Sequence, residues 1–123
     1  MINNYRRKLE LKDDMYIRTS YGRIDKILEL DDSYVKGVSQ KNNSYVYDLD
    51  SIVKVSYNII DILEVGDYVN GERVIGFGAF YYDDGTIERT SLTLDRTVTC
   101  LNSEIKSIVT HEQMEQMAYK VEE

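Results

Sequence analysis

The stretch that decides the fold is residues 73–94, which read RVIGFGAFYYDDGTIERTSLTL. Two runs rich in β-branched and aromatic residues flank Asp83-Asp84-Gly85, and a glycine-containing turn between two such runs predicts a β-hairpin. Gly76 and Gly78 share one face of the first run, a placement typical of a bulge or of a close approach by another backbone. This half of the chain is therefore predicted to contain an antiparallel sheet.

Short strand-like runs and turns continue on both sides of this hairpin. Asn70-Gly71 is a second hairpin signal, because both residues tolerate positive φ. The other predicted strands cover residues 14–19, 23–30, 34–38, 45–47, 51–55, 97–101 and 104–109. Ser56 and Gly66 are expected to bound a short helical turn, and Thr110-His111-Glu112-Gln113 fits a capping box that begins a short C-terminal helix over 111–118. The pattern predicts a mainly β fold with short helices (α+β) and compact antiparallel sheets.

The two halves of the chain resemble each other. Asp14-Met15-Tyr16 precedes Asp67-Tyr68-Val69 by 53 positions, and residues 50–56 are similar to residues 103–110. A period of this length indicates two copies of a small β unit, about 10–63 and 64–121, each a five-stranded bent sheet of the Src-homology-three-like type. The alternative is chance similarity among β-rich segments. We expect a single compact domain over 1–123, because each half alone is small enough to be marginally stable.

The chain has one cysteine and one histidine in 123 residues, Cys100 and His111. One cysteine cannot form an internal disulfide, and these two residues do not make a Cys/His zinc site. Cys100 is expected to be a small core residue and His111 a solvated turn residue. No catalytic residue, metal site or cofactor is predicted, and the chain is not expected to be an enzyme.

Apolar runs in the chain are short. None approaches the ~18 residues of a membrane-spanning helix, and residues 1–8 have basic side chains without the apolar run of a signal peptide. A cytoplasmic location is therefore expected.

Charge is distributed unevenly along the chain, whose net charge is −7. Residues 1–26 carry seven basic and four acidic side chains, whereas residues 27–123 carry eight basic and 18 acidic side chains. Neutralising phosphates requires Lys and Arg, so direct nucleic-acid binding is not expected. The acidic part predicts a basic partner instead; the alternative is a soluble acidic protein with a basic edge strand.

Tyrosines and turn carboxylates are the candidate binding residues. The 11 tyrosines are expected to supply much of the core's bulk, with some left at the surface, where Tyr is favoured in interfaces. Aromatic rings beside carboxylates suit an Arg-rich partner, whereas the alternative makes these rings cross-strand pairs. The candidate partner-binding residues are Asp31, Asp32, Asp48, Asp50, Tyr81, Tyr82, Asp83 and Asp84.

Two segments carry a family resemblance. Residues 58–71, NIIDILEVGDYVNG, and residues 105–115, IKSIVTHEQME, followed by Tyr119-Lys120-Val121, look similar to segments of small uncharacterised proteins of phages and prophages of low-GC Gram-positive bacteria. No catalytic residue carries over with this resemblance. It implies an accessory phage gene, and such genes include inhibitors of host defence, among them anti-CRISPR proteins. Those proteins are often acidic and often occupy the DNA-recognition groove of a CRISPR effector.

The leading functional hypothesis is thus a phage-encoded inhibitor of a host defence system. It would act in the host bacterial cytoplasm as an acidic DNA mimic on a host protein or nucleoprotein complex, a CRISPR effector above all. One alternative is a structural or virion-associated β module that self-associates through exposed strand edges. Another is a binder of a small anionic signalling ligand, with the basic residues of 6–26 as its lining.

Overall fold

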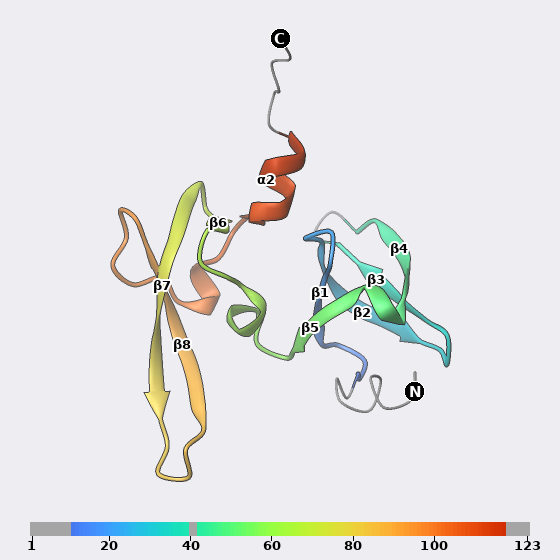
Figure 1. Cartoon of the computed structure of the whole chain (residues 1–123), viewed down its shortest axis with the longest axis horizontal. Coiled ribbons are helices and arrows are strands. Elements are labelled where there is room, and N and C mark those ends of the chain that lie inside the picture. The colour runs from blue at the N-terminus through green and yellow to red at the C-terminus, as the bar shows by residue number, and fades with distance from the viewer. Residues whose placement is uncertain (1–10, 40–41, 118–123) are drawn as a thin grey trace. The chain divides into compact units, whose positions relative to one another are not determined.

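The computed structural model describes residues 11–39 and 42–117 (Figure 1). The chain divides into two compact units, Met1–Ile62 and Leu63–Glu123. Each unit contains one antiparallel sheet, and the α-helix of the described chain, α2 (His111–Met117), belongs to the second unit. The predicted class, mainly β with antiparallel sheets and a short C-terminal helix, is confirmed.

The first unit is a five-stranded sheet with the strand order β4-β3-β2-β1-β5. Its last strand returns to the start of the unit, where Ser56 of β5 pairs with Tyr16 of β1. Its elements are β1 (Tyr16–Thr19), β2 (Ile24–Leu30), β3 (Tyr34–Val38), β4 (Ser44–Asp48), the 3-10 helix η1 (Leu49–Ser51), β5 (Ile52–Ser56) and the 3-10 helix η2 (Ile59–Ile62). The helical turn expected between Ser56 and Gly66 is η2.

The second unit is a four-stranded sheet with the order β8-β7-β6-β9. Its last strand also pairs with its first, and a 3-10 helix precedes that strand, as η1 precedes β5 in the first unit. This shared order of elements is what a duplicated β unit would produce, but the second sheet has four strands rather than the five predicted for each half. The elements are β6 (Tyr68–Val69), β7 (Glu72–Tyr81), β8 (Ile87–Leu94), the 3-10 helix η3 (Asn102–Glu104), β9 (Ile108–Val109) and α2.

Local turn chemistry explains why the second unit folds as it does. Asn70 and Gly71 form a two-residue loop between β6 and β7 with φ of 54° and 79°, as the Asn-Gly pair predicts. Gly85, with φ of 89°, closes the turn between β7 and β8. The β7–β8 register shifts beside both Gly76 and Gly78, so the predicted irregularity of that strand is confirmed.

Two expected strands are largely absent from the second unit. Residues 97–101 were predicted as a strand, but only an isolated bridge between Cys100 and Leu92 forms. Residues 104–109 were also predicted as a strand, and only residues 108–109 pair. Asn102–Glu104 instead turn as η3, where the Glu104 carboxylate accepts a hydrogen bond from the Leu101 amide at 2.8 Å.

Each unit has an aliphatic core. In the first unit, the buried cluster consists of Ile17, Ile27, Val35, Leu49 and Ile52. In the second unit, the buried apolar residues are Leu63, Val69, Val74, Leu92, Leu94 and Cys100. Cys100 is therefore the core residue that was expected. The expectation that tyrosine supplies much of the core is wrong: no described tyrosine is fully buried, since the aliphatic side chains suffice to fill these small interiors.

Tyr45 and Tyr47 are engaged within the first unit. The Tyr47 hydroxyl donates to the buried Asp25 carboxylate and accepts a hydrogen bond from Arg23 Nε at 2.8 Å. Burial raises the pKa of Tyr47, and the neighbouring Asp25 raises it further. The Arg23 guanidinium lies 3.8 Å from the Tyr45 ring centre. Both rings are thus engaged by contacts within the first unit.

Gly37 lies against this hydrogen-bonded group, and Gly37→Ala is expected to destabilise the first unit by about 1–3 kcal/mol. A Cβ at this position would lie 2.9 Å from Asp25 Cβ and 3.2 Å from a Tyr47 ring carbon, so β3 and its neighbours would have to move apart. Urea unfolding followed by circular dichroism measures the change. Gly76→Ala is the control, because its Cβ would meet Thr93 at an ordinary 3.9 Å; equal stability of the two variants would contradict the prediction.

Candidate functional site: the end of the β7–β8 hairpin and a histidine–carboxylate cluster

The structure distributes the predicted binding residues between the two units. Asp31 and Asp32 lie in the turn before β3, Asp48 ends β4 opposite Tyr34, and Asp50 lies in η1. Tyr81, Tyr82, Asp83 and Asp84 lie together at the end of the β7–β8 hairpin. All eight side chains are exposed at the surface.

The turn of this hairpin is closed by its own hydrogen bonds. The Tyr82 amide donates to the Thr86 carbonyl at 2.9 Å, and the Gly85 amide donates to the Tyr82 carbonyl at 3.0 Å. Asp84 Oδ1 accepts hydrogen bonds from both the amide and the hydroxyl of Thr86, which lowers the pKa of this carboxyl. These two hydrogen bonds favour the ionised form of the Asp84 carboxylate and orient it toward Thr86.

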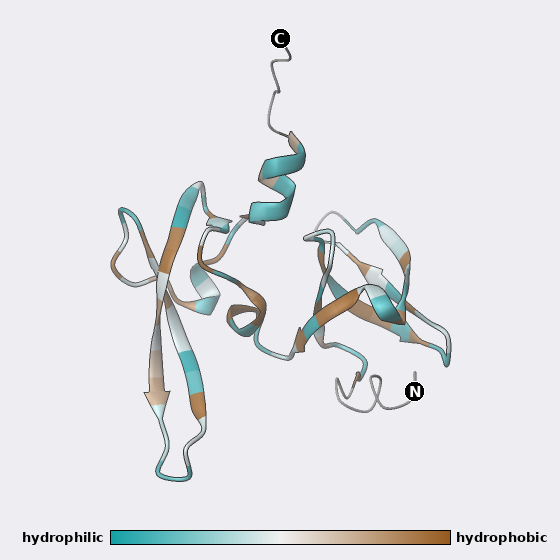
Figure 2. Cartoon of the chain, viewed as in Figure 1, coloured by the Kyte–Doolittle hydropathy of each residue, from teal (hydrophilic) through white to brown (hydrophobic). Residues whose placement is uncertain are grey.

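Both faces of the hairpin end carry exposed apolar side chains. Tyr81 and Ile87 pair directly across the strands and are 71% and 60% exposed. On the other face, Phe80 is 55% exposed and packs edge-on against Tyr82 with ring centres 4.8 Å apart. The Tyr82 hydroxyl donates to Glu88 at 2.7 Å. Figure 2 shows the hydrophobic colour continuing to the end of β7.

The hairpin end lies beyond the rest of its sheet. Strand β6 pairs with β7 only at Glu72 and Arg73, so in the described part of the chain Gly76–Tyr81 pair with β8 alone. The hairpin is anchored by Arg89, which lies opposite Ala79 and whose guanidinium stacks 3.8 Å from the Phe77 ring centre and donates to the Leu63 carbonyl at 2.8 Å. An anchored hairpin with an uncovered end provides a surface suited to a partner.

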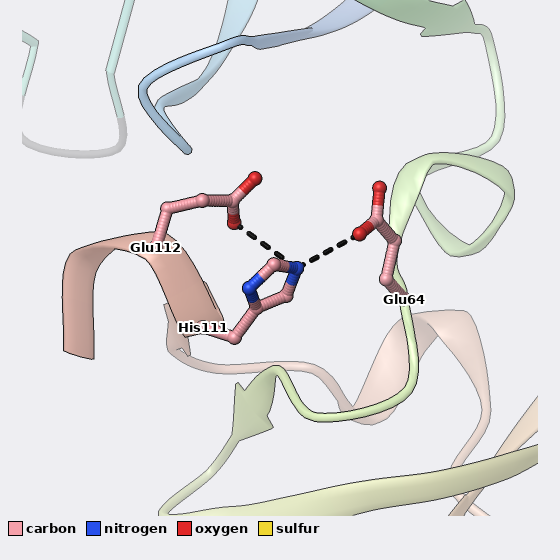
Figure 3. A group of neighbouring side chains, drawn as sticks. All are labelled: Glu64, His111 and Glu112. Atoms are coloured by element: carbon pink, nitrogen blue, oxygen red, sulfur yellow. Dashed lines mark hydrogen bonds and ion pairs between the residues drawn. The ribbon is translucent and has the colours of Figure 1, made fainter. Parts of the chain in front are cut away.

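A second group of polar side chains lies elsewhere in the second unit, in the cluster of Glu64, His111 and Glu112 (Figure 3). His111 Nε2 lies 2.8 Å from Glu64 Oε1 and 3.4 Å from Glu112 Oε1, so both carboxylates face the same ring nitrogen. The three side chains are partly buried, and their potential ligand atoms all lie within 4.8 Å of one another. A metal ion is the kind of ligand that such a set of atoms can hold.

Buried polar groups position this cluster. Asp67 is fully buried, and its two carboxylate oxygens accept hydrogen bonds from the Glu64 amide at 2.7 Å and the His111 amide at 3.0 Å. The predicted capping box also forms: the Gln113 amide donates to Thr110 Oγ1 at 3.3 Å, and the Thr110 amide donates to Gln113 Oε1 at 3.1 Å. The start of α2 is thus fixed against the segment that carries Glu64.

Sequence reasoning missed this cluster. His111 was expected to be a solvated turn residue, but its ring lies between two carboxylates. Glu64 and His111 are 47 positions apart, and no local periodicity relates them. Both residues lie in the segments 58–71 and 105–115 that the sequence analysis singled out, but nothing in either segment points to the other.

Two of the basic residues suggested as the lining for a small anionic ligand are engaged within the first unit. Arg18 is fully buried, with Nη1 donating to the Ile62 carbonyl at 3.0 Å, and Arg23 is engaged with Tyr47. Arg6, Arg7 and Lys8 lie outside the described residues. Arg18 therefore serves the interior of the first unit rather than a ligand surface.

Comparisons with known proteins add no further assignment. In the described chain, no helix is both long and apolar enough to cross a membrane. No protein-family model matches the sequence, and neither the curated proteins nor the solved structures contain a match.

Proposed function

We propose that this chain is a non-catalytic protein-binding module that uses the end of the β7–β8 hairpin to occupy a basic site on its partner. In its most specific form, the proposal is a phage-encoded inhibitor of host defence, and a CRISPR effector is the first partner to test. The observation that carries it is the uncovered hairpin end, with apolar side chains on both faces and carboxylates at the turn.

The composition of the hairpin end supports this use. Residues 81–88 carry three carboxylates and no basic side chain. Exposed tyrosines provide large contact area at low entropic cost and are common where binding energy is concentrated. Carboxylates around them complement arginine and lysine, and a groove that binds DNA presents those side chains to phosphates. An acidic, aromatic hairpin can therefore compete with nucleic acid for such a groove.

Competition with DNA tests the proposal. A purified CRISPR effector–guide RNA complex is immobilised, and binding of the chain is measured with and without target DNA at rising salt. We expect binding that excludes target DNA and weakens with salt, because complementary charges attract less when screened.

Variants locate the contact. Tyr81→Ala with Tyr82→Ala is expected to weaken binding at least tenfold, and Asp83→Asn with Asp84→Asn is expected to weaken it and reduce its salt dependence. Asp31→Asn with Asp32→Asn removes the same charge from an exposed turn of the first unit and is the matched control. Absence of binding, or equal effects of the two aspartate pairs, would contradict the proposal.

Self-association is the second candidate function, and one observation favours it. The outer edge of β7 over Gly76–Tyr81 has no neighbouring strand in the described chain, and open strand edges pair with other strands. A β module of a larger assembly would use this edge. Light scattering at increasing protein concentration separates the two candidates, since a defined oligomer favours self-association and a monomer favours a different partner.

A further inference from the structure

We infer that Glu64, His111 and Glu112 form a binding site for a divalent transition metal, with Zn²⁺ as the representative ion. This site lies apart from the hairpin end and does not depend on the function proposed for it. One nitrogen and two oxygen donors come from three side chains of the second unit.

The donor spacing fits one small metal ion. Two atoms that each lie about 2.1 Å from zinc at a tetrahedral angle are about 3.4 Å apart. His111 Nε2 lies 2.8 Å from Glu64 Oε1 and 3.4 Å from Glu112 Oε1. Figure 3 shows both carboxylates directed at this nitrogen. Metal binding would therefore require the Glu64–His111 pair to open by about half an ångström, and Nε2 would bind the metal in its unprotonated form.

The backbone around the site is already fixed. Asp67, with no exposed surface, accepts hydrogen bonds from the amides of both Glu64 and His111. The capping box of Thr110 and Gln113 fixes the first turn of α2, which carries Glu112. Supporting interactions of this kind orient ligands and reduce the entropy that is lost when the metal binds. An ordinary surface ion pair forms between mobile side chains and does not require a buried carboxylate that binds the backbone amides of both partners. The Asp67 carboxylate binds both amides here.

The donor types select among metals. Mg²⁺ and Ca²⁺ prefer all-oxygen sets, whereas imidazole suits Zn²⁺ and its transition-metal neighbours. Three protein ligands leave a fourth position of zinc for water or for an outside group. A metal here would also join the segment after η2 to the start of α2, and would stabilise the folded second unit through binding.

Calorimetric titration of the metal-free chain with Zn²⁺ tests the site. We expect one zinc ion per chain, no comparable heat with Mg²⁺ or Ca²⁺, and a higher melting temperature with zinc than without. Titration with Co²⁺ provides an independent readout, because the visible absorption bands of cobalt report its ligand geometry.

Variants distinguish this site from adventitious binding to an acidic surface. His111→Ala and Glu112→Gln are each expected to weaken zinc binding at least tenfold, whereas Glu115→Gln, on the exposed part of the same helix, is expected to leave it unchanged. Circular dichroism verifies that the variants are folded. Zinc affinity that is the same in all three variants, or no stoichiometric binding, would overturn the inference and leave an ion pair in its place. Neither result would affect the hairpin proposal, whose variants lie at residues 81–84.

Discussion

Asp67→Ala is expected to lower the free energy of unfolding of the second unit by about 3 kcal/mol, because two partly buried amides lose their buried acceptor. The Asp67 carboxylate bridges the Glu64 and His111 amides at 2.7 and 3.0 Å. The Asp67 side chain has no contact with solvent, so water cannot replace its carboxylate as the hydrogen-bond acceptor without a rearrangement. Asp67→Asn keeps one acceptor oxygen and is expected to lose less than Asp67→Ala.

Chemical denaturation measures this loss, and hydrogen exchange followed by mass spectrometry assigns it to a unit. Protection is expected to fall in peptides from residues 63–117 and to be retained in those from residues 11–62. Asp95→Ala is the matched control, because the Asp95 side chain is 49% exposed and its ion pair with Arg96 is long, at 3.9 Å. Surface pairs of this kind contribute little. A loss for Asp67→Ala no greater than that for Asp95→Ala would refute the bridging role.

Arg18→Ala is expected to destabilise the first unit by about 3 kcal/mol or more, because it combines a lost hydrogen bond with a cavity. Arg18 lies in β1 with no exposed surface, and its Nη1 donates to the Ile62 carbonyl at the end of η2. Truncation to alanine removes this donor and the aliphatic stem that packs inside the unit.

Arg18→Met separates packing from hydrogen bonding. Methionine fills most of the volume of the stem without a charge, and apolar replacements of buried charged groups are often tolerated. We therefore expect Arg18→Met to be clearly more stable than Arg18→Ala. Urea unfolding compares them, with hydrogen exchange in the peptides that contain η2 as the local readout. If both variants lose the same stability, the donor to Ile62 dominates; if neither loses any, the burial argument is wrong.

Features encoded by neighbouring residues were predictable from the sequence. Asn70-Gly71 and Asp83-Asp84-Gly85 identified both hairpins of the second unit, because positive φ is a local requirement. The capping box identified the start of α2 because its two hydrogen bonds join residues only three positions apart. The run 97–101 was misread because β-branched residues favour strands only where a neighbouring strand is available, and here only Cys100 finds one.

Features that depend on distant residues were not predictable in this way. Arg18 was counted with the basic surface of residues 1–26, although the fold buries it beneath η2. The Glu64–His111 contact and its Asp67 bridge exist only after β6 and β9 have paired. The hairpin end was partly predictable, since Tyr81, Tyr82 and the turn aspartates were chosen from sequence. Its exposure on both faces was not, because it follows from the shortness of β6.

The return of the last strand to the first in each unit has a consequence for synthesis on the ribosome. Tyr16 of β1 pairs with Ser56, which is synthesised 40 positions later, and Tyr68 of β6 pairs with Val109, which is synthesised 41 positions later. Neither sheet can close while its final strand is still inside the exit tunnel, so the first unit completes its pairing while the second is still being made. Strands β7 and β8 emerge before β9, and their contacts with each other are local in sequence. The β7–β8 hairpin is therefore the earliest structure that the second unit can form.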